Sequence, residues 1–283
     1  MKFENLQRFE ACVFSLPEYE LKDLYTERGE KADGKYLGVF IKDTNKLIQA
    51  VSKKYILIQH KDVLLPFIDF LKRINAKISG CVFDVNGKMI AEITFDDKSL
   101  FVKPDDEIKL GVTIINSVDR SSSIKIVFFG KRVVCENGMY LNVGNISNIK
   151  EIHYGDKNLS KNLIEFYAKT IKKLQSISEV WNDVIQRSMQ RIIEDKIIEY
   201  LLAGSGFGKY KIKYLLKKIK EAQAKTGWDI YNVITEWLTH EAKISWDSKK
   251  YYHDKASEML ISIANDGTER LVEQGKTILE KEV

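Results

Sequence analysis

The chain has 283 residues, 44% of them hydrophobic and 30% charged, which is typical of a soluble globular protein long enough to bury a core. Its formal charge of +5 is by itself too small to indicate a nucleic-acid partner. We expect neither a membrane span nor a signal peptide, because no segment approaches roughly 20 apolar residues and MKFENLQRFEACVFSL lacks an apolar core with a cleavage site.

Between about residues 36 and 145 the apolar runs are short, as in strands. An amphipathic helix is predicted over 61–74, with Asp62 and Pro66 near its start. The Asn86-Gly87 pair between two apolar runs predicts a hairpin. The predicted strands are KYLGVFI from Lys35, KYILIQH from Lys54, CVFDV, MIAEITF, EIKLGVTIINS, SSIKIVFFG and RVVC.

After about Leu159 apolar residues recur every three or four positions, which predicts a long helix that Ser160 caps and the glycine-rich segment 203–208 ends. Three further helices are predicted over 209–225, 228–243 and 255–281. The sequence thus predicts an α+β fold, an N-terminal antiparallel sheet with a packed helix followed by a C-terminal helical region. We expect a sheet-rich domain over 1–155 and a helical domain over 156–283.

The three cysteines, Cys12, Cys81 and Cys135, are far apart and form no C-x-x-C pair. A disulfide framework or zinc site is therefore not expected, and the expected compartment is a reducing cytoplasm. The chain is rich in lysine and glutamate, which agrees with a heat-adapted source, although AT-rich codon usage would give the same composition.

The stretch KRVVCENGMYL allows two interpretations of Cys135. Its β-branched neighbours and the Glu-Asn-Gly turn signal favour a small buried hydrophobe at the end of a strand. A reactive thiolate would need a nearby histidine or helix N-terminus. Lys131 and Arg132 are basic, but no histidine is close in sequence, so the buried interpretation is preferred.

Four segments carry a resemblance to a known family. NSVDRSSSIKI followed by RVVCENG is similar to the signature of an uncharacterised phage/plasmid-like protein family, domain of unknown function 932, whose members have approximately Asn-Ser-x-Asp-Gly-Ser-Ser-Ser and then Arg-x-Val-Cys-x-Asn-Gly. KYILIQHKDVLLPFIDFL and GWDIYNVITEWLTH also resemble the family, so the resemblance covers about residues 50–245. The motif positions are Asn116, Ser117, Asp119, Ser121, Ser122, Arg132, Cys135, Asn137, Gly138, Tyr231, Asn232, Thr235 and Glu236.

The resemblance implies a gene of a mobile element, or one that a host acquired, and supplies no activity. Arg120 stands where the family usually has glycine, which argues against a turn geometry that only glycine adopts. The order of elements is also similar to that of phage single-strand annealing proteins, at the level of the fold alone.

Positive charge is concentrated in GSGFGKYKIKYLLKKIKEAQAK, residues 204–225, where seven lysines and one glutamate give +6 and leave −1 for the rest of the chain. A lysine stripe with tyrosines beside it suits a phosphate backbone and unstacked bases. The alternative is a solvated face whose lysine stems cover the core. The candidate nucleic-acid-binding residues are Lys209, Lys211, Lys213, Lys217, Lys218, Lys220, Tyr210, Tyr214, Lys131 and Arg132.

The glycines before this run superficially resemble a phosphate-binding loop. That loop has the spacing G-x-x-x-x-G-K-[ST] after a buried strand, whereas Tyr210 stands here in the Ser/Thr position and the preceding IIEDKIIEYLL predicts a helix. A glycine hinge between helices is the simpler interpretation.

No catalytic constellation, metal site or cofactor is predicted. The four histidines show no H-x-x-x-H or H-x-E motif, and the Asp-rich pairs occur in predicted turns. In the segment 116–123, the Asn, Asp and serine side chains are expected to satisfy the backbone groups of a turn.

Taken together, the residues favour a non-enzymatic nucleic-acid-binding protein of mobile-element type, acting on DNA by single-strand binding or annealing in recombination or replication. A homo-oligomer is compatible with this function, and no membrane partner is expected. One alternative is a protein-interaction or assembly module that docks through helices 160–202 and 255–281. A second alternative is a metal-dependent nuclease, which would need several acidic ligands around Mg²⁺.

Overall fold

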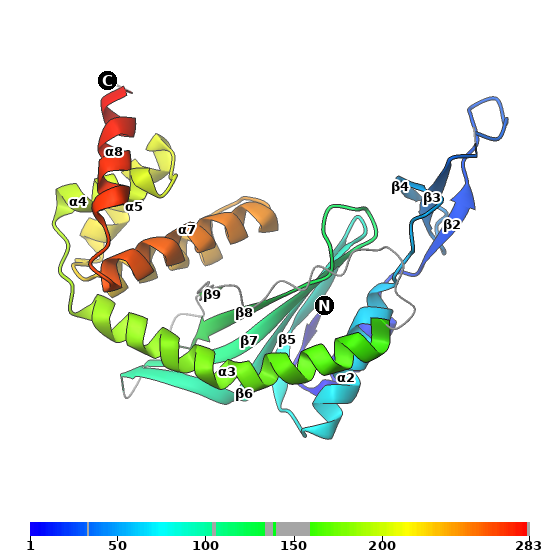
Figure 1. Ribbon diagram of the computed structural model, residues 1–283, viewed down its shortest axis with the longest axis horizontal. Helices are drawn as coiled ribbons and strands as arrows, with labels where there is room; N and C mark the ends of the chain where they lie inside the picture. Colours follow the sequence, from blue (N-terminus) through cyan, green and yellow to red (C-terminus); the bar gives the residue numbers. More distant parts are fainter. Residues whose placement is uncertain (33, 104–105, 134–137, 140–158, 282–283) are drawn as a thin grey trace. The chain divides into compact units, whose positions relative to one another are not determined.

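The computed structural model describes residues 1–32, 34–103, 106–133, 138–139 and 159–281 (Figure 1). The fold is α+β, with antiparallel sheets and packed helices in the N-terminal part and helices in the C-terminal part, as the sequence predicts. Within these residues no helix is both long enough and apolar enough to cross a membrane.

The strands form two sheets in the described part of the chain. A six-stranded sheet has the order β1-β5-β6-β7-β8-β9, and a three-stranded sheet has the order β2-β3-β4. The strands are β1 (Lys2–Phe3), β2 (Tyr19–Asp23), β3 (Tyr36–Ile41), β4 (Leu47–Ser52), β5 (Ile78–Val85), β6 (Lys88–Lys103), β7 (Asp106–Ser117), β8 (Lys125–Arg132) and β9 (Gly138–Met139). The helices are α1 (Leu6–Phe14), α2 (His60–Arg73), α3 (Leu159–Met189), α4 (Asp195–Gly204), α5 (Lys209–Glu221), α6 (Gly227–Glu236), the π-helix η1 (Trp237–Glu241), α7 (Trp246–Ala264) and α8 (Glu269–Lys281).

The predicted hairpin at Asn86-Gly87 is confirmed. Asn86 and Gly87 have φ angles of 52° and 87°, the left-handed conformation that a two-residue turn with the twist of its strands requires. β5 and β6 pair antiparallel on either side of the turn, with Val85 opposite Lys88. The predicted helix over 61–74 is also confirmed, since α2 covers His60–Arg73.

The described residues divide into two compact units that are discontinuous in sequence. The first lies within Met1–Lys98, Gly111–Phe128 and Asn145–Leu174, and the second within Ser99–Leu110, Phe129–Gly144 and Gln175–Val283. Strands β6, β7 and β8 and helix α3 therefore contribute residues to both units. The predicted domain boundary at residues 155 and 156 lies outside the described residues and stays a prediction.

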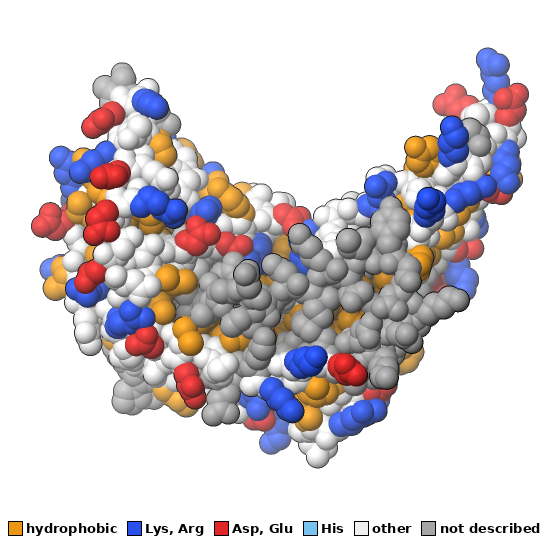
Figure 2. All heavy atoms as spheres, viewed as in Figure 1, with side chains coloured by type: hydrophobic (Ala, Val, Ile, Leu, Met, Phe, Trp, Pro, Cys, Tyr) orange, Lys and Arg blue, Asp and Glu red, His pale blue; other side chains and the backbone are white. Residues whose placement is uncertain are grey.

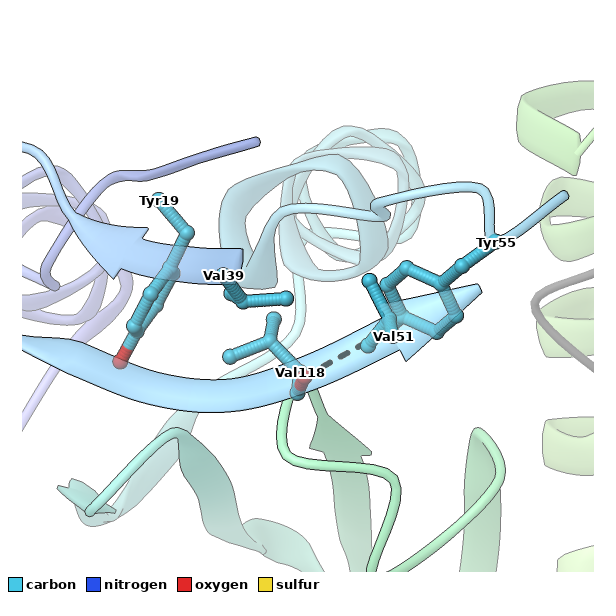
Figure 3. Packing of buried hydrophobic residues seen from close by; sticks show 5 residues of the cluster. All are labelled: Tyr19, Val39, Val51, Tyr55 and Val118. Carbon is cyan, nitrogen blue, oxygen red and sulfur yellow. Dashed lines mark hydrogen bonds between the residues drawn. The ribbon is translucent and has the colours of Figure 1, made fainter. Parts of the chain in front are cut away.

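In the first unit, the three-stranded sheet packs on a small apolar cluster. Figure 3 shows the cluster, Tyr19, Val39, Val51, Tyr55 and Val118, which are at most 7% exposed. The hydroxyl of Tyr55 donates a hydrogen bond to the carbonyl of Val118 at 3.5 Å, so the loop before α2 is fixed to the end of β7.

The first part of α3 packs on α2 in the same unit. The hydroxyl of Tyr167 donates to the carbonyl of Val63 at 2.8 Å, and its ring centroid lies 4.8 Å from that of Phe67. Tyr167 is fully buried, so this contact joins an element late in the sequence to a helix near its beginning.

In the second unit, the rest of α3 packs on the ends of the long strands. Trp181 is fully buried, and a Cβ on Gly130 of β8 would lie 3.0 Å from its ring. Gln186 Nε2 donates to the carbonyl of Val102 on β6 at 3.1 Å. Residue 130 is therefore small because the indole takes the space of its side chain.

Helices α4 and α8 approach each other at two glycines. A Cβ on Gly204 would lie 1.9 Å from the carbonyl oxygen of Leu271, and a Cβ on Gly275 would lie 2.0 Å from that of Tyr200. Both contacts involve backbone atoms of the opposite helix. The two helices can pack at this distance only because neither position carries a side chain.

The first part of the sequence, up to residue 35, contains β1, α1 and β2, which no local pattern in the sequence predicted. Two predicted strands are not found as predicted. Residues 55–59 of KYILIQH are irregular, and the strand before them is β4. The side-chain amide of Gln59 makes two hydrogen bonds to the backbone of Tyr19. It accepts from the N–H at 3.0 Å and donates to the carbonyl at 2.8 Å. This segment is thus fixed by side chains rather than by a ladder of backbone hydrogen bonds. Of RVVC, Arg132 ends β8, Val133 is in a turn, and residues 134–135 lie outside the described residues.

Three helix predictions also need correction. Ser160 is not an N-cap, because α3 already begins at Leu159. The predicted helix 160–202 is divided into α3 and α4, and the predicted helix 255–281 into α7 and α8, with α7 beginning before it at Trp246. The glycine-rich segment does end α4, as predicted.

Candidate functional site

Two segments that carry the family resemblance meet in the first unit. Asn116, at the end of β7, donates through Nδ2 to His60 Nδ1 at 3.0 Å and to the carbonyl of Ile58 at 3.2 Å. His60 Nε2 contacts Asp84 Oδ2 of β5 at 2.7 Å. Because a carboxylate only accepts, this arrangement assigns the imidazole proton to Nε2 and makes Nδ1 the acceptor for Asn116.

Asp84 is the centre of this polar network. The hydroxyl of Tyr19 donates to Asp84 Oδ2 at 2.8 Å, and the N–H of Gly87 donates to Oδ1 at 3.1 Å. Burial by itself would raise the pKa of Asp84, but the hydrogen bonds from His60, Gly87 and Tyr19 outweigh it and hold the pKa below its usual value. The carboxylate therefore stays ionised at neutral pH and joins β2, α2, β5 and β7.

In the turn after β7, the side chains of Ser117, Asp119 and Ser122 bond to backbone groups as expected, whereas that of Asn116 does not. Asp119 Oδ1 accepts from the N–H of Ser121 at 2.9 Å, and Ser117 Oγ donates to the carbonyl of Ser122 at 2.8 Å. Asn116 is the exception, because its amide bonds to His60 and Ile58 and not to the turn.

The backbone at Arg120 differs from the expectation that a turn without the family's glycine would avoid a glycine-like geometry. Its φ is 67°, in the left-handed region that glycine favours. The turn thus keeps a glycine-like backbone conformation although an arginine occupies the position. We expect this conformation to strain the backbone by about 1 kcal/mol.

Two other segments of the resemblance meet in the second unit. Arg132, at the end of β8, donates through Nη2 to Asp106 Oδ2 at 2.5 Å and through Nε to Asp106 Oδ1. Its guanidinium carbon lies 5.9 Å from the ring centroid of Trp228 on α6. Since Asp106 is 7% exposed, Arg132 neutralises a buried carboxylate and positions it against α6.

The α6 motif residues serve mainly the packing of their own helix. Tyr231 is fully buried, and its ring stacks on that of Trp228 at 5.7 Å. Asn232 Nδ2 donates to the carbonyl of Trp228 at 2.9 Å, and Thr235 Oγ1 donates to the carbonyl of Asn232 at 3.1 Å. Glu236 is exposed at the end of the helix. This part of the resemblance therefore marks a structural helix with one charged residue at its end.

Cys135 and Asn137 lie outside the described residues, so the two interpretations of Cys135 stay open. Gly138 belongs to β9, which pairs antiparallel with β8, and Gly138 is opposite Lys131. Lys131 is half-buried. The assignment of Lys131 and Arg132 to a nucleic-acid surface stays a prediction, and the bidentate pair with Asp106 gives Arg132 a different partner.

Helix α5 carries the predicted basic face. Three of its apolar residues are buried against the rest of the unit; they are Ile212, Leu215 and Ile219. At 3.6 residues per turn, four lysines fall within an arc of about 80° that contains none of these three residues. These lysines are Lys209, Lys213, Lys217 and Lys220, and all four are exposed.

Lysines of α5 outside this arc have partners in the fold. Lys218 donates to Glu241 of η1, and the hydroxyl of Tyr214 donates to the same carboxylate. The hydrogen bond from Lys218 and, to a smaller extent, that from Tyr214 hold the pKa of Glu241 below its usual value. Lys211 Nζ lies 5.0 Å from the ring centroid of Tyr252 on α7. The arc and these paired side chains are therefore different faces of one helix.

Inside the arc the lysines are much less constrained. In the part of the chain that the structure describes, Lys209, Lys213 and Lys220 form no salt bridge, and Lys217 has only an exposed pair with Glu221 at 3.7 Å. Tyr210, which is 83% exposed, stands beside them. We call Lys209, Lys213, Lys217, Lys220 and Tyr210 the lysine face.

Around α4, α5 and α8 the surface is of mixed charge. Figure 2 shows basic and acidic side chains close together over this region, at the upper left of the view. The surface that this view shows is thus not uniformly basic, and the lysine face is defined by the residues of α5 alone. Its effect on a polyanion depends on short-range contacts, since charges further away than about 8 Å are screened at physiological salt.

The glycine-rich segment before α5 is a helix–helix connection. α4 ends at Gly204 and α5 begins at Lys209, with Gly208 as its N-cap. The phosphate-loop interpretation requires a preceding strand, and the structure has a helix there. Over the described residues, no group of three or more His, Cys, Asp or Glu side chains is arranged to hold a metal ion.

Sequence reasoning missed the partners of the motif residues. His60 and Asp84 were not assigned to Asn116, and Glu241 was not assigned to Lys218. Asn116 and His60 are 56 positions apart, and no local pattern marks such a pair. For Glu241 the sequence offered only a weak signal, because it is one of three acidic residues, Asp229, Glu236 and Glu241, that follow the lysine run.

Comparison with known proteins identifies one family. The model of the family described as Domain of unknown function (DUF932) matches residues 47–264. No curated protein and no solved structure matches the chain.

Proposed function

Because the chain belongs to the DUF932 family, a domain of unknown function, we propose from its own residues that it is a non-enzymatic nucleic-acid-binding protein. The observation that carries the proposal is the lysine face, where four exposed lysines and an exposed tyrosine lie on one side of α5. Lysines that bind phosphates release condensed counterions, which drives association. A tyrosine beside them offers a surface on which bases stack.

The burial pattern of α5 supports this proposal over a passive solvated face. Lys211 and Lys218 lie against Tyr252 and Glu241, so the fold uses them to fix the helix. Lys209, Lys213 and Lys220 have no such role among the described residues, yet each carries the cost of like charges placed close together. A polyanion bound along the face would relieve this repulsion.

We propose DNA as the polyanion and a mobile-element process, single-strand binding or annealing in recombination or replication, as the setting. The family resemblance and the element order support this setting, and a homo-oligomer on one strand would fit it. The protein would act in a reducing cytoplasm, in keeping with three cysteines that are far apart in the sequence and form no C-x-x-C pair. A non-enzymatic role is supported by the buried positions of the motif residues Asn116, Tyr231 and Thr235.

The test is a fluorescence anisotropy titration of the intact protein with labelled DNA and RNA across salt concentrations. We expect the logarithm of the association constant to fall linearly with that of the salt concentration. Lys209→Ala/Lys213→Ala/Lys217→Ala should weaken binding at low salt. The slope of the logarithm of the association constant against that of the salt concentration should also become less steep by about 2 to 3, since each lost phosphate contact contributes roughly 0.7 to 0.9.

A matched control removes three other exposed lysines. Lys53→Ala/Lys54→Ala/Lys77→Ala changes the net charge equally and should leave the slope unchanged, because these residues lie outside α5. An equal loss in both variants would mean that net charge, and not the lysine face, drives binding. Failure of the unaltered protein to bind any nucleic acid at low salt would overturn the proposal.

Two parallel assays address the alternatives. Turnover of labelled DNA or RNA with Mg²⁺ or Mn²⁺ would replace the non-enzymatic proposal with a nuclease. A defined protein partner in a pull-down, with no nucleic-acid affinity, would favour an assembly module.

A further inference from the structure

A cluster of aromatic side chains lies at the N-terminal end of α5. Tyr251 and Tyr252 are neighbours on α7, with ring centroids 5.2 Å apart and planes at 78°. Tyr252 packs against Phe207, whose centroid is 5.1 Å away, and Lys211 lies over its ring. Phe207 is 3% exposed and belongs to the connection between α4 and α5. The cluster is therefore anchored in the core of the unit on one side.

Tyr251 is the outward member of this cluster. It is 49% exposed, and a Cβ on Gly206 would lie 3.3 Å from its hydroxyl. Gly206 precedes Tyr210 of the lysine face by four positions. Lys255 Nζ lies 5.8 Å from the ring centroid of Tyr251 and pairs with Glu258 at 2.8 Å. A half-exposed tyrosine, in contact with Tyr252, thus lies next to the glycine connection that leads into α5, whose first residue is Lys209 of the lysine face.

We infer that Tyr251 is a stacking platform for an unpaired base of a single-stranded nucleic acid whose phosphates follow the lysine face. The inference rests on the proposed function and deepens it by assigning strand preference to a residue outside α5. Tyr252 limits the motion of Tyr251 through the edge-to-face contact, so less conformational freedom is lost when a base stacks. Tyr210 offers a second aromatic ring four residues after Gly206.

Base stacking distinguishes single strands from duplexes. In a duplex the bases are already stacked on each other and present only their edges in the grooves. In a single strand every base has a free face, so stacking on a tyrosine adds affinity with little dependence on sequence. The lysines act on both forms, because both have phosphates. Loss of the Tyr251 ring should therefore weaken binding to single strands only. Loss of the lysines should weaken binding to single strands and to duplexes.

The test compares an unstructured labelled oligothymidylate with a duplex of equal length at one low salt concentration. Tyr251→Ala should weaken single-strand binding about ten-fold and leave duplex binding unchanged within two-fold. Tyr251→Phe, which keeps the ring, should bind the single strand like the unaltered protein. Tyr25→Ala removes another exposed tyrosine, 63% exposed and outside this cluster, and should change neither affinity.

A second readout is independent of affinity. Ultraviolet irradiation with an oligonucleotide that carries 5-iododeoxyuridine should cross-link the peptide that contains Tyr251, identified by mass spectrometry, and not the peptide that contains Tyr25. Thermal melting of each variant shows whether the substitution perturbs the fold. Because Tyr251 is half-exposed, its replacement should change stability little.

The possible results separate this inference from the proposed function. Equal weakening of both probes by Tyr251→Ala, or no effect on either, overturns the stacking platform and leaves the lysine face intact. Absence of binding to both probes by the unaltered protein overturns the proposed function and this inference with it.

Discussion

Asp84 illustrates how single residues are fixed by partners far away in the sequence. Its carboxylate accepts hydrogen bonds from Tyr19, His60 and the backbone of Gly87, which belong to three different elements or turns. Arg132 is comparable in the second unit, where it holds Asp106 by two parallel hydrogen bonds. In both cases a mostly buried carboxylate accepts hydrogen bonds from partners that are distant in the sequence.

The Asp84 network predicts an acid-sensitive stability. The folded pKa lies below the unfolded value of about 3.9. The stabilisation is therefore complete above the unfolded pKa and is lost as the pH falls through the folded pKa. We expect Asp84→Asn to lower the free energy of unfolding at pH 7 by about 1 to 3 kcal/mol and to flatten its decline below about pH 4.

Urea denaturation monitored by circular dichroism between pH 2 and pH 7 measures this effect. Asp43→Asn is the control, because Asp43 is an exposed carboxylate in the β3–β4 turn. It should change neither the stability at pH 7 nor the acid profile. Identical profiles for the two variants would exclude Asp84 as the source of acid sensitivity.

Arg132 should contribute to stability more than to binding. Arg132→Ala leaves the buried carboxylate of Asp106 without its bidentate partner, and we expect a loss of about 3 to 5 kcal/mol. Arg132→Lys should restore only part of it, since an amine makes no bidentate pair. Lys213→Ala is the converse control, with a stability change of about 0.5 kcal/mol or less and weaker nucleic-acid binding. Thermal melts and anisotropy titrations together would show whether the two variants differ in this way.

At the scale of elements, helix ends were harder to predict than helices. Ile192 and Ile193 keep helical spacing, yet they lie between α3 and α4 because the backbone pairs with the segment before α6. The N–H of Ile193 donates to the carbonyl of Lys225 at 2.9 Å, and that of Gly227 to the carbonyl of Arg191 at 2.9 Å. Long-range hydrogen bonds thus replace a turn of helix, and local periodicity does not report them.

The break between α7 and α8 is marked by a local signal in the sequence. Asn265-Asp266-Gly267 contains three residues that favour turns, and Asp266 has a φ of 55°. The start of α7 is also marked, since Ser245 caps the helix by accepting from the N–H of Ser248 at 3.2 Å. Capping and turn residues would have corrected this prediction where periodicity alone did not.

The packing of α4 on α8 predicts a severe effect of a single methyl group. Gly275→Ala places a Cβ against the carbonyl oxygen of Tyr200, so the helices must separate. We expect a loss of about 1 to 3 kcal/mol or more, measured by chemical denaturation. Gly208→Ser is the control, because a Cβ there meets no atom within 4 Å and serine is a good N-cap. A Gly275→Ala protein as stable as its parent would contradict the close approach.

At the scale of the whole molecule, the two units do not follow the order of the chain. The second unit includes Ser99–Leu110 and Phe129–Gly144, far from its helices in sequence. Asp106 and Arg132 come from these stretches, and Trp228 comes from the helical region. The positive charge, in contrast, is contiguous in the sequence, because the segment 204–225 carries the whole positive excess.

This interleaving predicts that the helical half does not reach full stability alone. A fragment 156–283 lacks the strand segments that cover Trp181 and Trp228, and we expect a broad, weakly cooperative thermal transition. Co-expression of the fragments 1–155 and 156–283 should restore a single cooperative transition and co-purification. A sharp, unchanged transition for 156–283 alone would support the continuous domain boundary that the sequence suggested.

The sequence by itself determined the α+β class, the β5–β6 hairpin, helix α2 and the basic, amphipathic character of α5. Each of these follows from neighbours a few positions apart, through alternation, helical spacing or turn residues such as Asn86 and Gly87. Only the tertiary structure decided which lysines have partners, because Glu241 and Tyr252 reach α5 from other elements. It alone also joined Asn116 to His60 and Asp84, since contacts between distant segments depend on the packing of the whole chain and leave no local pattern.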